Sequence, residues 1–232
     1  MGAGRGVFVV FEGSEKGGKK TQSKLLADAL TQISGKKTLH IHFPDKSTST
    51  GRIITRYLTH EINLAPRAAH LLFTANRWER QTEIAAALDE GRHVVVDRYS
   101  YSGIVYTAAQ SDQVSEVDWT WCCTTESGLI KPDVIFCLTP GEMIEIAARD
   151  GFGQRPSETA SFQTRVLTYY SRLSREMENE LTAVANEVDA TVTGDTEAPS
   201  CSKPKLWNWI QATGQTIDEI HTCIMTILDP LL

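Results

Sequence analysis

The sequence GSEKGGKKT at Gly13–Thr21 follows a short apolar run and precedes a stretch of helical period. It matches the pattern G-x-x-x-x-G-K of a phosphate-binding loop at Gly13, Gly18 and Lys19. In such a loop the backbone N–H groups wrap phosphates at a helix N-terminus, while the lysine reaches the outer phosphates. The alternative is an ordinary glycine-rich turn, but the apolar run before the segment and the helical stretch after it favour a phosphate site.

Short β-branched and aromatic runs alternate with longer helical stretches along the chain, a pattern typical of βαβ units and a parallel sheet. The predicted strands are Val7–Phe11, Thr38–Phe43, His93–Val96, Asp133–Leu138 and Leu206–Ile210. The predicted helices are Lys19–Ile33, Gly51–Thr59, Pro66–Leu88, Tyr101–Ala109, Glu142–Arg149, Ser161–Ala183 and Ile217–Leu228. Pro66 suits a first helical turn, and Gly35 and Gly91 suit helix ends. We expect one domain over residues 1–232, with a polar surface loop at Glu187–Lys205.

Composition describes a globular protein and excludes several classes of partner. The chain has 232 residues, of which 41% are hydrophobic and 22% charged, without a disordered or collagenous signature. Its Lys and Arg residues number 23 against 29 Asp and Glu, a formal net charge of −6. This balance argues against binding to nucleic acid polymers or anionic membranes. A local cationic site for a small anion remains compatible with it.

The cysteines and the N-terminus indicate a reducing compartment. The 5 cysteines are odd in number and none forms a C-x-x-C pair, so we expect reduced thiols in the cytoplasm or another reducing compartment. They are Cys122, Cys123, Cys137, Cys201 and Cys223. We expect no signal peptide, because Met1–Gly6 lacks an apolar core, and no segment of the ~20 apolar residues that span a bilayer.

The position after Lys19 departs from the phosphate-loop pattern. It should hold Ser or Thr, whose hydroxyl binds Mg²⁺, but here it is Lys20. Thr21 does not replace that hydroxyl, since one residue further along a helix is rotated by about 100°. Our hypothesis is that nucleotide phosphates, water and Asp97 hold the metal.

Two charged residues follow a predicted strand at Asp97 and Arg98. Ligands of open parallel sheets collect beyond the carboxyl ends of the strands. Asp97 is therefore placed to hold metal-bound water, and Arg98 to grip a phosphate with two parallel hydrogen bonds. The alternative is a structural Asp–Arg pair.

Two further segments suggest a site for a nucleotide base and its phosphate. Lys46 adds a cation after the second predicted strand. Phe73 and Arg77 stand four residues apart and share one helix face, where Phe73 could stack on a base and Arg77 could donate to its edge. Taken alone, Phe73 would more often lie in the core and Arg77 in solvent.

These blocks together resemble the thymidylate kinase family over nearly the whole chain apart from Glu187–Lys205. The matching blocks are FEG at Phe11–Gly13, FP at Phe43–Pro44 with Thr48 and Gly51, LLFTANRWE at Leu71–Glu79, DRYSYSG at Asp97–Gly103 and GLIKPD at Gly128–Asp133. The resemblance implies a P-loop NTPase fold, a three-layer α/β/α sandwich with a central five-stranded parallel sheet and a helical lid. It implies transfer of the γ-phosphoryl group of ATP to dTMP, giving ADP and dTDP, with Mg²⁺. It also implies a homodimer.

The resemblance assigns roles to individual residues. Those implied for ATP binding are Gly13, Lys16, Gly17, Gly18, Lys19, Lys20, Thr21 and Arg149. Those implied for dTMP binding are Glu15, Phe43, Lys46, Phe73, Arg77, Arg98, Ser102, Gly103 and Tyr106. The catalytic candidates are Lys16, Lys19, Asp97, Arg98 and Arg155, with Asp97 as the metal ligand. The functional segments are then the phosphate loop 13–21, the acceptor segments 43–51, 71–79 and 97–106, and a lid at 149–161.

Several residues depart from the family pattern. Glu15 stands in place of an Asp, and Lys46 and Lys16 stand in place of arginines. Gln154–Ser157 has no tyrosine of the kind that blocks a 2′-hydroxyl, which leaves discrimination against ribonucleotides open. Because one methyl group in a pocket is worth only about 1–3 kcal/mol, we expect dUMP to be a weaker substrate. We expect dCMP to be rejected more strongly, since it presents a donor to Arg77.

Two other functions remain open from the sequence. One is a kinase for another nucleoside monophosphate. The other is a nucleotide-binding regulatory protein whose turnover is impaired because Lys20 replaces the Mg²⁺-binding hydroxyl. Since sites rather than folds carry function, only the acceptor residues separate these interpretations.

Overall fold

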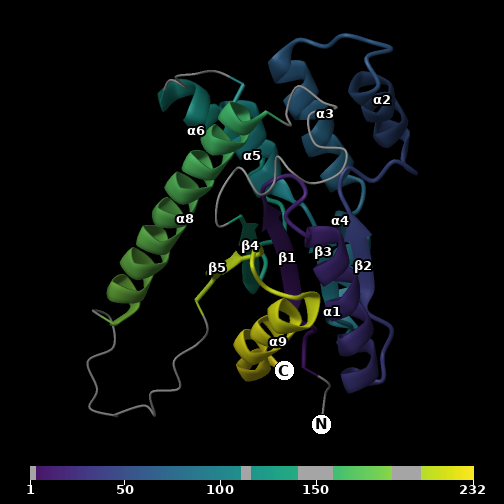
Figure 1. The fold of residues 1–232 in the computed structure, drawn as a ribbon, viewed down its shortest axis with the longest axis vertical. Coiled ribbons are helices and arrows are strands. Elements are labelled where there is room, and N and C mark those ends of the chain that lie inside the picture. Colours follow the sequence, from purple (N-terminus) through teal and green to yellow (C-terminus); the bar gives the residue numbers. More distant parts are fainter. Residues whose placement is uncertain (1–3, 111–115, 141–158, 190–204) are drawn as a thin grey trace.

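The computed structural model describes residues 4–110, 116–140, 159–189 and 205–232. A five-stranded sheet in the order β2-β3-β1-β4-β5 forms its centre, and every neighbouring pair of strands is parallel (Figure 1). The strands are β1 (Phe8–Gly13), β2 (Leu39–His42), β3 (Val94–Asp97), β4 (Val134–Thr139) and β5 (Trp207–Gln211). All five predicted strands are therefore confirmed, each within a few residues of its expected bounds.

The helices cover both faces of this sheet and its carboxyl edge. They are α1 (Lys19–Ser34), α2 (Ser49–Leu58), α3 (Pro66–Trp78), α4 (Gln81–Asp89), α5 (Ser100–Ala108), α6 (Glu116–Thr125), α8 (Ala160–Asp189) and α9 (Ile217–Leu228), with a short 3₁₀ turn at Asp229–Leu231. Pro66 lies in the first turn of α3, while Gly35 and Gly91 end helices at φ 67° and 70°, as expected. Among the described residues no helix is both long and apolar enough to cross a membrane.

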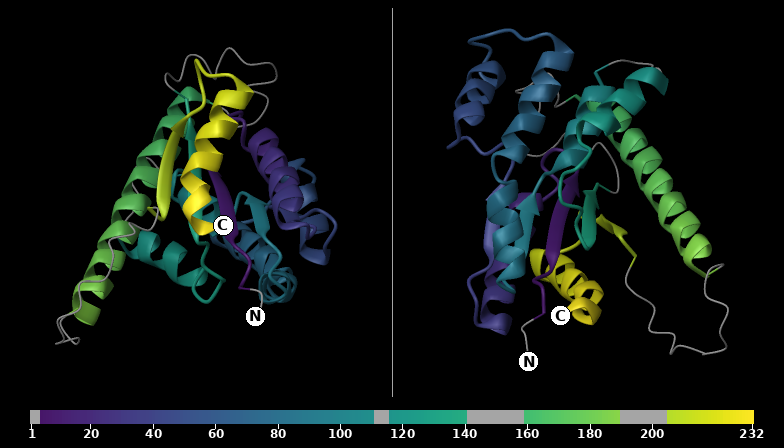
Figure 2. Two further views of the ribbon diagram at one scale, coloured as in Figure 1. Left: turned by 90° about the horizontal axis from the view of Figure 1, so that it is seen from below. Right: turned by 180° about the vertical axis from the view of Figure 1, so that it is seen from behind.

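Two hydrophobic clusters fill the spaces between the sheet and the helices on its two faces. Alternate residues of β1 point to opposite faces: Val9 and Phe11 pack with α1 and α9, whereas Phe8 and Val10 pack with α4, α5 and α8. Figures 1 and 2 accordingly place α1 and α8 on opposite sides of the sheet. The three central strands β1, β3 and β4 are buried on both faces, which explains why each is a nearly continuous apolar run, whereas the edge strands β2 and β5 are partly exposed. The predicted three-layer α/β/α sandwich is confirmed.

The helix predicted at Pro66–Leu88 is wrong as a single element. The chain leaves α3 after Trp78 and begins α4 at Gln81. The Arg77 carbonyl accepts a bond from the Arg80 N–H three residues on, and another from the Gln81 side chain at 3.2 Å. These bonds replace the regular helical pattern, although neither Gly nor Pro marks the break.

Three other expectations are corrected or fall outside the described residues. Helix α6 was not predicted. Helix α8 runs to Asp189, so residues 187–189 of the predicted surface loop are helical, and residues 160–161 of the predicted lid also belong to α8. The helix expected at Glu142–Arg149 and the remaining parts of lid and loop, residues 149–158 and 190–204, lie outside the described residues.

Candidate active site

The phosphate loop connects β1 to α1 at the carboxyl edge of the sheet. Gly13 has φ 119°, and a Cβ there would stand 2.0 Å from the Leu138 carbonyl oxygen, so only glycine fits. Gly18 has φ 89° and caps α1 without a side-chain hydrogen bond. The first N–H groups of α1 therefore face the loop, the arrangement that binds phosphates. This confirms the strand, loop and helix predicted around the motif.

Lys19 is folded over its own loop. Its side chain is 5% exposed, and its Nζ donates to the Gly13 carbonyl at 3.2 Å and to the Ser14 carbonyl. Burial, together with the charge of Arg98, lowers the pKa of Lys19 to about 8. The ammonium group thus stays mainly protonated at neutral pH. Lys20 and Thr21, by contrast, are exposed on the first turn of α1.

Asp97 ends β3 as a buried carboxylate. It is 3% exposed, and its Oδ2 bonds to Nδ1 of His42 at 3.0 Å. Its Oδ1 is buried with no hydrogen-bond partner in the part of the chain that the structure describes. Burial alone would raise the pKa of Asp97, but the His42 hydrogen bond and the charges of Lys19 and Arg98 lower it. The group is an anion with one free oxygen, which suits a cation or metal-bound water.

Arg98 lies between the phosphate loop and α5. Its Nη2 pairs with Glu15 Oε2 at 3.0 Å, its Nη1 donates to Ser102 Oγ at 3.4 Å, and its guanidinium lies 5.1 Å from the centre of the Tyr106 ring. Its φ of 66° is in the left-handed region, a costly conformation for a residue with a side chain. Four of the predicted site residues are therefore brought together here.

A buried carboxylate, that of Glu12, also belongs to the site, although the sequence did not predict it. Glu12 is 0% exposed and accepts from the N–H groups of Tyr99 and Ser102, at 2.9 and 3.0 Å, and from the Tyr170 hydroxyl at 2.7 Å. It thereby holds the N-terminus of α5 and joins α8 to the end of β1. The position of Glu12 inside the FEG block is the sequence signal that could have identified it.

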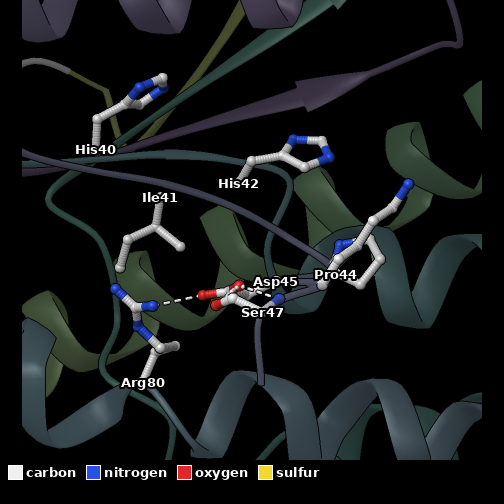
Figure 3. Close-up of a pocket in the computed structure, with 8 residues that line it drawn as sticks. His40, Ile41, His42, Pro44, Asp45, Ser47 and Arg80 are labelled. Atoms are coloured by element: carbon white, nitrogen blue, oxygen red, sulfur yellow. Dashed lines mark hydrogen bonds and ion pairs between the residues drawn. The ribbon is translucent and has the colours of Figure 1, made fainter. Parts of the chain in front are cut away.

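The acceptor segment after β2 surrounds a cavity of about 390 Å³. His40, Ile41, His42, Pro44, Asp45, Lys46, Ser47 and Arg80 line it. Figure 3 shows the Asp45–Arg80 ion pair at one side and the two histidines pointing to the other. Lys46 is exposed at this cavity, whereas Phe43 is 2% exposed and packs against Tyr99 in the core.

An asparagine of α3 fixes the acceptor segment. Asn76 Oδ1 accepts from the Asp45 N–H at 2.8 Å, and its Nδ2 donates to the Asp45 carbonyl at 3.0 Å. A Cβ on Gly51 would stand 1.9 Å from that same carbonyl. The LLFTANRWE block therefore serves partly to hold this segment in place, a role that its sequence did not reveal.

Phe73 and Arg77 occupy one face of α3 as expected, in contrasting surroundings. Phe73 is half-buried with its ring edge-on to Tyr57 at 6.4 Å. Arg77 is 3% exposed and forms an ion pair with Glu126, just after α6. Gly103 lies against this pair. The sequence did not single out Glu126, which stands 49 residues from its partner.

Of the remaining predicted site residues, Gly17 is buried in the phosphate loop, and the others are exposed or lie outside the described part. Lys16, in the phosphate loop, is exposed at φ 56°. Arg149, Arg155 and Ser157 lie outside the described residues, so their predicted roles in binding and lid closure stay predictions.

Comparisons with known proteins agree on one family. The family model described as Thymidylate kinase matches residues 11–193. A thymidylate kinase of Dictyostelium discoideum is 39% identical over 166 residues, covering 72% of each chain. The Homo sapiens enzyme is 35% identical over 176 residues, 76% of this chain and 80% of that one.

A solved structure extends the similarity to the fold. The thymidylate kinase of Candida albicans superposes with a TM-score of 0.75 at 31% identity, covering 97% of this chain and 92% of that one. The sheet and its flanking helices thus have a counterpart of known fold.

Proposed function

The chain belongs to the thymidylate kinase family, and on that premise we propose that it phosphorylates dTMP at the carboxyl edge of its sheet. ATP is the phosphoryl donor. An oxygen of the dTMP 5′-phosphate attacks the γ-phosphorus, the bond from that phosphorus to the β,γ-bridging oxygen breaks, and ADP leaves with its electron pair. Because the attacking oxygen carries no proton to remove, the protein's task is positioning and neutralisation of charge.

One observation carries the proposal: Arg98, next to the buried carboxylate of Asp97 in the chain, pairs with Glu15 of the phosphate loop at 3.0 Å. Lys19 belongs to the donor loop, and Arg98 lies at the entrance to α5. A phosphate held by each residue would bring the two reacting groups together across Asp97. Arg98 would grip the acceptor phosphate, and Lys19 would follow the charge of the transferred group.

Asp97 also fits Mg²⁺. The free, buried Oδ1 of this carboxylate is the kind of hard oxygen that the ion prefers. Among the described residues no group of three His, Cys, Asp or Glu could hold a metal, so phosphates and water would complete its shell. When bound, the ion supplies positive charge that neutralises the phosphates. Exposed Lys20 contributes no oxygen ligand.

The base would be bound on the α3 side of the site. We assign stacking on thymine to Phe73 and donation to its O4 to Arg77, with Ser102, Gly103 and Tyr106 around the nucleotide. Lys46 and Arg98 would bind the acceptor phosphate, and Glu15, paired with Arg98, would contact the nucleotide. The half-buried ring of Phe73 and the fixed guanidinium of Arg77, one helical turn apart, support this assignment.

We further propose that two copies associate through α3. Leu71 and Trp78 are 49% and 46% exposed and stand seven residues apart, hence on one face of this helix. Large apolar side chains exposed on one helix face are a common feature of helix-mediated interfaces. Light scattering in solution should give twice the chain mass of 25.7 kDa.

The deciding experiment is a coupled ADP-release assay with MgATP and a panel of dTMP, dUMP, dCMP, dGMP, AMP and UMP. The highest kcat/KM should be for dTMP, with dUMP about 10–200-fold lower because it lacks one methyl group. Mixtures without acceptor give the background. Faster turnover of another base would favour a different monophosphate kinase, and no release with any acceptor would favour a regulatory protein.

A further inference from the structure

The Arg77–Glu126 ion pair is buried and bidentate. Arg77 Nε donates to Glu126 Oε2 at 2.9 Å, and Arg77 Nη2 donates to Glu126 Oε1. Both side chains are 3% exposed. Two parallel hydrogen bonds fix the orientation of a guanidinium plane, whereas a lysine or a singly bonded arginine can still reorient. The pair therefore fixes where the remaining N–H groups of Arg77 point.

Glu126 is itself held on the side away from Nε. Thr74 Oγ1 donates to its Oε1 at 2.7 Å, and His70 Nε2 lies 3.5 Å from that oxygen. Both ring nitrogens of His70 bond to hydroxyls, Thr107 at 2.8 Å and Thr125 at 2.7 Å. Burial lowers the pKa of His70, so the ring stays neutral and does not compete with Arg77 for the carboxylate. Helices α3, α5 and α6 thus converge on one carboxyl group.

Gly103 leaves the space that this pair occupies. A Cβ at this position of α5 would stand 2.5 Å from Arg77 Nη2 and 2.9 Å from Glu126 Oε1. Such contacts are cheap when the opposing side chain is free to move. Here both side chains are held by two or more bonds, so the glycine is a requirement of the ion pair and not only of a bound nucleotide.

We propose that Glu126 is the positioning residue that sets the base specificity of the site. This proposal rests on the proposed function, in which Arg77 donates a hydrogen bond to the base. A mobile arginine could swing away from the 4-amino group of cytosine and leave the site tolerant of that base. An arginine pinned by Glu126 must meet that amino group donor to donor, whereas it bonds to the O4 of thymine or uracil. A fixed N–H donor that finds no acceptor on the wrong base costs binding free energy, and this cost discriminates between similar substrates.

The test is to compare Glu126→Gln and Glu126→Asp with the wild type in kcat/KM for dTMP and for dCMP at saturating MgATP. Glutamine loses the charge and one acceptor oxygen, which frees Arg77. We expect the KM for dTMP to rise about tenfold or more, with kcat changed by about threefold or less. The ratio of kcat/KM for dTMP over dCMP should fall about tenfold or more. Aspartate keeps the charge and should give an intermediate ratio.

The matched control is Glu176→Gln. Glu176 accepts from Trp119 of α6 at 2.8 Å and pairs with Arg172 at 2.7 Å, so it attaches the same helix α6 to α8. This variant should lower the melting temperature and leave the base ratio at the wild-type value. If Glu126→Gln does not fold, Thr74→Val removes one bond to Glu126 without changing charge and should lower the ratio several-fold. A wild-type ratio in folded Glu126 and Thr74 variants would overturn the proposal. An inactive wild type would instead overturn the proposed function.

Discussion

The two sides of the site are built from different parts of the chain. The donor side is mostly backbone, a glycine loop and the first turn of α1 within nine consecutive residues, Gly13–Thr21. The base side is a network of buried side chains, where Arg77 on α3 meets Glu126 beyond α6, 49 residues away. A backbone site is encoded locally, whereas a side-chain site depends on how three helices pack.

The glycines on each side show the same difference. A Cβ on Gly13 would meet a carbonyl of β4 at 2.0 Å, and a strand in the centre of a sheet cannot yield. A Cβ on Gly103 would meet the ends of two side chains. Substitutions on the donor side should therefore abolish activity, whereas substitutions on the base side should alter the selectivity and affinity for the nucleotide base.

Replacing Lys19 should give the largest effect. Lys19→Met removes the buried ammonium group that would follow the transferred charge, and kcat should fall by about a thousandfold. The affinity for dTMP should change little, because Lys19 belongs to the donor side. A coupled assay gives kcat and calorimetry gives the binding of dTMP. Lys24→Met, at an exposed lysine on the same helix, is the control; a tenfold or smaller loss for Lys19→Met would mean that Lys19 does not serve the transition state.

Adding one methyl group at Gly103 should give an intermediate effect confined to the base side. Gly103→Ala displaces the Arg77–Glu126 pair, so the KM for dTMP should rise about tenfold, consistent with the ~1–3 kcal/mol cost of disturbing a buried polar pair. The KM for ATP should stay within about twofold, and it serves as the internal control. Equal increases in both KM values would show that the two sides are not independent.

The same contrast explains what the sequence could predict. The central strands were predictable because strands buried on both faces are continuous apolar runs, and the edge strands because β2 and β5 keep apolar residues at alternate positions. The phosphate loop was predictable because its residues are neighbours. Phe73 and Arg77 were found through their helical spacing. Glu126, Glu12 and His42 were not, because each acquires its role from a partner on another strand or helix. His42 is the register partner of Asp97, a relation that needs the order of the strands.

Local patterns also failed where tertiary contacts override them. Helix α6 contains EVDWTWCCTT, whose Trp, Thr and Cys residues show no helical period, yet Trp119 and Cys122 pack in the core. The break between α3 and α4 depends on the Gln81 side chain, which donates to the Arg77 carbonyl and also bonds to Tyr99 and Ile130. A helix end that is set by such tertiary contacts requires no Gly or Pro, so the sequence carries no local signal for it.

The smallest expected effect lies at the one departure from the loop motif on the donor side. Lys20→Ser restores a hydroxyl and removes a positive charge from the neighbourhood of the metal. A unit charge about 8 Å from a doubly charged ion in water is worth about 1 kcal/mol, or roughly fivefold in an equilibrium constant. The Mg²⁺ concentration for half-maximal rate should therefore fall about fivefold, measured at saturating ATP and dTMP.

Lys24→Ser is the matched control for this variant, since it removes a charge from the same exposed helix one turn further on. It should leave the Mg²⁺ requirement unchanged, because screening by water and salt removes the effect of a more distant charge. If Lys20→Ser also leaves the requirement unchanged, the ion is held without regard to this position. The metal would then be held by phosphates, water and Asp97 alone, which would make the contrast with the side-chain network around Glu126 sharper still.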